Sequence, residues 1–146
     1  MKVISRCAVL GLVLLAAACS DSKITGIPVA PDLTPPGALE SFSGTLEPQG
    51  ISLHTFTVAQ TGNVQVTLIG VVPQLVPGPS APITVGLGIG TPSGLGTCLV
   101  LYQVSAQPGT TAQIIGTATA GPDCVTIFDV GNLTQPVNYT LTVAHS

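Results

Sequence analysis

The sequence has no lysine or arginine after Lys23, and charged residues make up only 6% of its 146 residues. Nucleic-acid binding needs cations that neutralise phosphates, and electrostatic contact with anionic lipid headgroups needs several of them. The cation-free part of the chain therefore excludes both. It also excludes salt bridges to Lys or Arg, so apolar burial and backbone hydrogen bonds must stabilise the fold.

Side chains suited to catalysis are also scarce. No serine stands in the Gly-x-Ser-x-Gly pattern of a nucleophile elbow. Of the two histidines, His54 lies in a predicted strand and is expected to be packed or exposed, and His145 is expected to be frayed. Asp123 and Asp129 flank one predicted strand, and its length separates them too far for a catalytic pair. The sequence predicts a protein that is not an enzyme and uses no cofactor.

The first 18 residues have the pattern of a secretory signal peptide. Basic Lys2 and Arg6 precede an apolar run over 8–18 that ends in small residues. This run is shorter than the roughly 20 residues that a membrane-spanning helix needs. Cys19 follows directly, so the segment resembles the lipobox of bacterial lipoproteins, in which this cysteine becomes the acylated N-terminus. The usual leucine three residues before the cysteine is replaced here by Ala16.

This resemblance implies an exported protein that is anchored in a membrane through the lipid on Cys19. Ser20 favours the outer membrane or cell surface of a bacterial envelope. The alternative is an ordinary signal peptide cut after Ala16 or Ala18, which leaves Cys19 as a free thiol. An exposed unpaired thiol is a liability outside the cell, which favours the lipoprotein.

Two further parts follow the signal peptide. The lipid-bearing tether over 19–39 is proline-rich, which predicts a semi-rigid spacer. Residues 40–146 consist of short runs rich in Val, Ile and Thr that Gly, Pro and Asn interrupt, a pattern typical of β-strands. We expect an all-β fold: a small antiparallel β-sandwich with jelly-roll-like connections. The eight predicted strands are 41–46, 51–59, 63–71, 83–90, 97–104, 112–119, 123–130 and 137–144.

The strand predicted at 83–90 places Gly86, Gly88 and Gly90 on its outward face. Sheet curvature is the favoured explanation, and a surface that contacts a ligand is the alternative. The proline-rich loop predicted at 72–82 is either a binding loop or a cover for a sheet edge.

The cysteines predict one disulfide bond. Cys7 leaves with the signal peptide and Cys19 is acylated, so Cys98 and Cys124 remain as a pair in an exported chain. Their spacing does not suggest a zinc site.

Calcium binding is weakly supported. Asp123, Asp129 and Asn132 offer hard oxygen ligands, but no continuous calcium-loop pattern joins them. Because Gly131 and Asn132 follow Asp129, a turn-capping or solvated aspartate is expected there. The sequence thus predicts no metal site.

Five segments spread over residues 42–144 carry a resemblance to a known family: 44–46, 54–58, 62–68, 120–129 and 139–143. They resemble the bacterial pre-peptidase C-terminal domain family. The resemblance implies a small jelly-roll sandwich that accompanies secreted enzymes as a non-catalytic module. Relatives bind collagen with calcium. This chain has a cysteine pair, no attached peptidase and no acidic residues in its middle, so neither collagen nor calcium binding is transferred.

Together these features predict a lipid-anchored, non-catalytic module that binds a protein or a glycan at the cell envelope. The alternative is a structural subunit of a surface layer or fibre, because the predicted strand edges lack the lysines that normally block edge pairing.

Trypsin cleaves after lysine and arginine, so we expect it to cut the chain at Lys23 and nowhere beyond, even after unfolding. Mass spectrometry of the digest should show an uncut fragment over 24–146. Fragments that begin after residue 24 would contradict the prediction.

Overall fold

The computed structural model describes residues 37–75 and 82–146. Four parts of the sequence interpretation lie outside these residues: the predicted signal peptide (1–18), Cys19, most of the tether (20–36) and the middle of the predicted 72–82 loop. The described residues contain no helix, and thus none that is long and apolar enough to cross a bilayer. Their eight strands are β1 (Ala38–Leu46), β2 (Ile51–Val58), β3 (Gly62–Pro73), β4 (Val85–Ser93), β5 (Thr97–Ala106), β6 (Ile114–Ala118), β7 (Gly121–Phe128) and β8 (Val137–His145).

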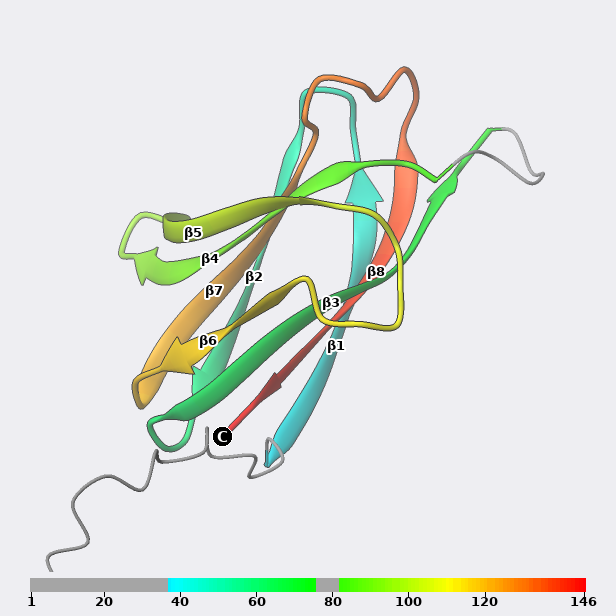
Figure 1. Ribbon diagram of the computed structural model, residues 1–146. Coiled ribbons are helices and arrows are strands. Elements are labelled where there is room, and N and C mark those ends of the chain that lie inside the picture. The colour runs from blue at the N-terminus through cyan, green and yellow to red at the C-terminus, as the bar shows by residue number, and fades with distance from the viewer. Residues whose placement is uncertain (1–36, 76–81) are drawn as a thin grey trace, which may run out of the picture. The chain divides into compact units, whose positions relative to one another are not determined.

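The strands form two antiparallel four-stranded sheets, as Figure 1 shows. One sheet has the order β1-β8-β3-β6 and the other β2-β7-β4-β5. Consecutive strands mostly fall in opposite sheets, which is the connectivity of a jelly roll. The predicted all-β jelly-roll sandwich is therefore confirmed, and each predicted strand corresponds to an observed one with shifted ends.

The core lies between the two sheets because the strands alternate apolar and polar residues. In β3, Val64, Val66 and Leu68 are buried, as the sequence predicts, and the residues between them are less buried. In β8, Tyr139 and Leu141 are likewise buried. Each fully buried Val or Leu side chain contributes about 1.5–3 kcal/mol, so this alternation supplies much of the stability.

The glycines of β4 lie on the outer face of their sheet but are buried, not exposed. A side chain at Gly86 would collide with the Phe128 ring, and one at Gly88 would meet Thr126 and Val100. At Gly90 the pairing with β5 shifts register, and the backbone approaches closely. Side chains of neighbouring strands therefore cover the outer face of β4. At Gly86 and Gly88 these contacts indicate close packing of neighbouring side chains rather than a ligand surface.

The disulfide between Cys98 and Cys124 is present, with 6.0 Å between the two Cα atoms. Cys98 belongs to edge strand β5 and Cys124 to β7, and β4 lies between these strands. The bond thus ties the edge of this sheet to an inner strand. It confirms the predicted pairing.

Replacing both Cys98 and Cys124 by alanine should lower the free energy of unfolding by roughly 3.5 kcal/mol, because the bond constrains a loop of 26 residues in the unfolded chain. Removing both sulfurs avoids a buried free thiol. Urea unfolding followed by circular dichroism measures the change. A loss below about 1 kcal/mol would contradict this role.

Candidate functional site

A cleft of about 370 Å³ opens between β6 of one sheet and β4 and β5 of the other. Its existence follows from the residues that β6 turns inward. β6 is five residues long, and its small inward residues Gly116 and Ala118 line the cleft. A Cβ atom added at Gly116 would meet only Val64, at 4.0 Å. The space beside this strand is therefore left open by the sequence itself.

The walls of the cleft are mostly apolar. Val64 and Ile114 are buried parts of the core, whereas three large side chains around the opening are exposed: Leu101 (72%), Tyr102 (55%) and Ile115 (67%). Exposed apolar groups that gather at a concave surface are typical of a binding site. The volume lies at the lower end of the roughly 300–1,000 Å³ of small-molecule sites, which suits a few side chains of a partner.

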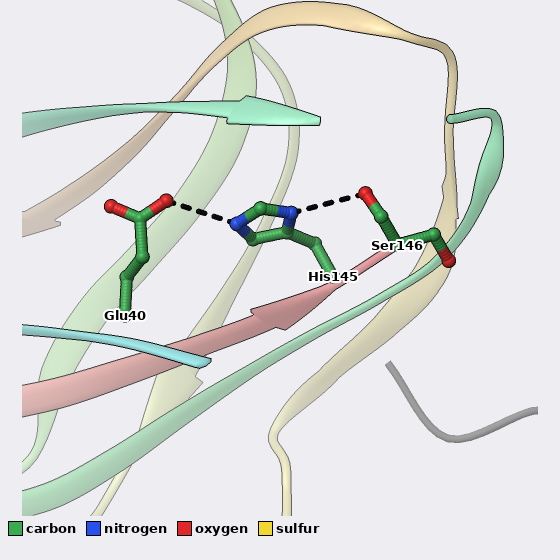
Figure 2. Close-up of polar contacts among 3 residues, drawn as sticks. All are labelled: Glu40, His145 and Ser146. Atoms are coloured by element: carbon green, nitrogen blue, oxygen red, sulfur yellow. Dashed lines mark hydrogen bonds and ion pairs between the residues drawn. The ribbon is translucent and has the colours of Figure 1, made fainter. Parts of the chain in front are cut away.

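Asp123 of β7 is the charged residue among those that line the cleft. Burial raises the pKa of its carboxyl group, and the nearby His145 opposes that shift. His145 does not bond to Asp123 directly, because both of its ring nitrogens have other partners. Its Nε2 lies 2.9 Å from Glu40 Oε1, and its Nδ1 lies 3.2 Å from the backbone oxygen of Ser146 (Figure 2).

His145 contradicts the expectation of a frayed residue. Its side chain is only 3% exposed, and its ring lies 5.2 Å from that of Phe56. The reason is that β8 is an inner strand, so that its last residue pairs with Ala38 on one side and Val64 on the other. Pairing on both sides holds His145 in the sheet.

Glu40, His145 and Ser146 lie together without forming a catalytic triad. The contact from His145 reaches the backbone oxygen of Ser146, not its hydroxyl group (Figure 2). The Ser146 hydroxyl instead lies against Gly62. These three residues therefore lack the hydrogen bond between nucleophile and base that activates a serine.

His54 is packed within the sandwich. The sequence left two possibilities open, a packed or an exposed side chain, and the first is the one observed. Its Nε2 lies 2.7 Å from the Tyr139 hydroxyl, and its ring stacks on Phe42 at 4.8 Å. Burial lowers the pKa of His54, which favours the neutral ring at pH 7. These contacts assign His54 a structural role.

Asp129 caps the turns at the far end of β7, which confirms its predicted role. Its Oδ2 accepts a hydrogen bond from the Gln49 N–H, at 2.8 Å. Its Oδ1 accepts the N–H groups of Gly131, Asn132 and Leu133, at 2.8–3.1 Å. Burial alone would raise the pKa of Asp129, but these four bonds lower it. Both oxygens of the carboxylate thus accept backbone N–H groups and hold the turns.

Asp123 and Asp129 remain at opposite ends of β7 and do not meet. Within residues 37–75 and 82–146, no group of three or more His, Cys, Asp or Glu side chains could hold a metal ion.

The sequence interpretation missed the cleft. The signal was present in the run Ile114-Ile115-Gly116-Thr117-Ala118, where two of the three inward positions, after Ile114, fall on the small residues Gly116 and Ala118. Which neighbouring strands face this gap depends on the sheet order, and the sequence alone did not supply it.

No family model and no curated protein matches the sequence. Among solved structures, one described as "Crystal structure of PirA" matches with 13% identity and a TM-score of 0.37. The match covers 73% of this chain and 93% of that one. So low a similarity supports no inference, and the resemblance to the pre-peptidase C-terminal family stays a prediction.

Asp129→Ala should lower the free energy of unfolding at neutral pH by roughly 1 kcal/mol, because four backbone donors lose a charged acceptor. The loss is no larger because the site is exposed, so that water replaces some of the lost hydrogen bonds. The lowered pKa of Asp129 means that its stabilisation is present above about pH 3.8 and is lost as the pH falls through the folded-state pKa. The difference between variant and wild type should therefore shrink in acid.

Urea unfolding at neutral pH and in acid measures this, with Glu47→Ala, an exposed carboxylate in the same turn, as control. A difference that is equally large at both pH values would contradict the capping role.

Proposed function

We propose that this protein is a lipid-anchored, non-catalytic binding module on the outside of a bacterial envelope, and that its cleft takes an apolar segment of a protein partner. The observation that carries the proposal is the cleft between β6 and the β4–β5 pair, with Leu101, Tyr102 and Ile115 exposed around it. Burying such side chains against a partner is favourable by about 25 cal/mol for each Å² of apolar surface.

Export and anchoring are supported by the sequence pattern over 1–18 and by Cys19. The Cys98–Cys124 disulfide is consistent with an oxidising compartment, where such bonds persist. A proline-rich tether after the lipid would leave the sandwich free to meet partners at the membrane surface.

A protein partner is favoured over a glycan by the composition of the cleft. Sugars are usually held by aromatic faces together with several polar groups. Here Tyr102 is the one aromatic residue lining the cleft, and Asp123 the one charged residue. Nucleic acid is not expected as a partner, because residues 24–146 contain no Lys or Arg.

Assembly into a fibre or layer is the second candidate, and one observation favours it. Edge strand β5 is ten residues long and exposes Leu99 and Leu101. It carries no charged side chain that would block pairing with another strand. Light scattering distinguishes the two candidates. The mean molar mass of a fibre subunit should rise with protein concentration, whereas that of a binding module should stay at the monomer value.

Gly116→Val should abolish partner binding without unfolding the protein, because Gly116 lines the cleft and a Cβ atom added there would meet only Val64, at 4.0 Å. Gly70→Val is the matched control. It makes the same change in β3 outside the cleft, where an added Cβ atom also has open space. For the experiment, the chain that includes the tether carries Cys19→Ser, which removes the lipid. It is immobilised and exposed to solubilised envelope proteins.

Wild type and Gly70→Val should retain the same protein, and Gly116→Val should lose it. Equal retention by Gly116→Val would contradict the cleft as the binding site. Retention of nothing by folded wild-type protein would contradict the proposed function.

A further inference from the structure

The carboxylate of Asp123 is the unusual feature of an otherwise apolar cleft. Within the described part of the chain, no hydrogen bond or ion pair to its side chain is found. Its neighbour His145 is already engaged at both ring nitrogens, by Glu40 and by the backbone of Ser146. The carboxylate is thus directly available to a bound group.

The rest of the domain cannot neutralise this charge. Residues 37–146 contain four carboxylates, Glu40, Glu47, Asp123 and Asp129, and no lysine or arginine. Glu40 bonds to His145, and Asp129 accepts four backbone N–H groups. Glu47 lies exposed in the turn after β1. Asp123 alone is set among apolar groups that a partner would cover.

Covering an unpaired carboxylate with an apolar segment would be unfavourable, because the charge loses water without gaining a partner. A segment that brings its own cation avoids this cost. The long apolar stems of lysine and arginine also pack against apolar walls while the charged end stays near solvent. The charge and the apolar surface of the cleft therefore complement the same kind of side chain.

We propose that the partner segment bound in the cleft carries a lysine or arginine, whose cation pairs with Asp123 while adjacent apolar residues contact Leu101, Tyr102 and Ile115. This inference rests on the proposed function. A second copy of the sandwich does not meet the requirement, because residues 37–146 of that copy contain no lysine or arginine.

Three acetylated and amidated peptides, Leu-Lys-Leu, Leu-norleucine-Leu and Leu-Glu-Leu, test the inference. Their middle side chain is cationic in the first peptide, apolar in the second and anionic in the third. All eight strands lie within residues 37–146, so the exported chain without its signal peptide, carrying Cys19→Ser, contains every contact described. NMR titration of its backbone amides locates each peptide and gives its dissociation constant.

We expect the lysine peptide to shift the Gly116, Ala118 and Asp123 signals and to bind about fivefold more tightly than the norleucine peptide, the ratio of a partly exposed ion pair. The glutamate peptide should bind most weakly. In Asp123→Asn, and at about 1 M salt, the lysine and norleucine peptides should become equal. Glu47→Gln removes the same charge at the other end of the sandwich and should leave the order unchanged.

Two failures are distinguishable. Peptides that bind the cleft equally well would overturn the inference and leave the proposed function standing. Peptides that shift no cleft signal would overturn both.

Lys23→Gln tests whether the chain's own tether occupies the cleft. A lysine peptide that binds this variant much more tightly than wild type would refute an external partner, and equal affinities support one.

Discussion

The absence of any lysine or arginine from the folded part of the chain is the constraint on which its polar organisation depends. A carboxylate in this part of the chain can therefore pair only with a histidine, a backbone donor or water. Glu40 bonds to His145, and Asp129 accepts four backbone N–H groups that order two turns. Within the described residues Asp123 has no hydrogen bond to a histidine or to a backbone donor, and it is also the carboxylate that lines the cleft.

The jelly-roll topology explains why the cleft lies where it does. Strands β6 and β5 are both edge strands, one in each sheet. Because β6 is short and turns Gly116 inward, the two sheets lack a large side chain to join them there. The disulfide fixes β5 to β7, so the other wall of the cleft is held in place while its apolar side chains remain exposed.

The fold could be predicted from the sequence because it depends on local alternation. Val64, Val66 and Leu68 mark an inner face wherever the strand is placed, and residues 40–146 contain two cysteines, Cys98 and Cys124, which allow one pairing. Features that depend on which strands are neighbours could not be predicted. The expectation that His145 frays was wrong because its pairing with β1 and β3 is non-local. The contact of Phe128 with Gly86 could not be predicted either, because the two residues lie on different strands. The cleft was missed for the same reason.

Photo-crosslinking in intact cells tests the central claim most directly. A photoreactive amino acid replaces Ile115 beside the cleft or, as control, exposed Ile69 on β3, in the protein expressed with its predicted signal peptide. The account predicts an adduct with another protein from position 115 and not from position 69, and the linked peptide should be apolar with a lysine or arginine. An adduct from position 115 only with lipid, or only with a second copy of this chain, would contradict it.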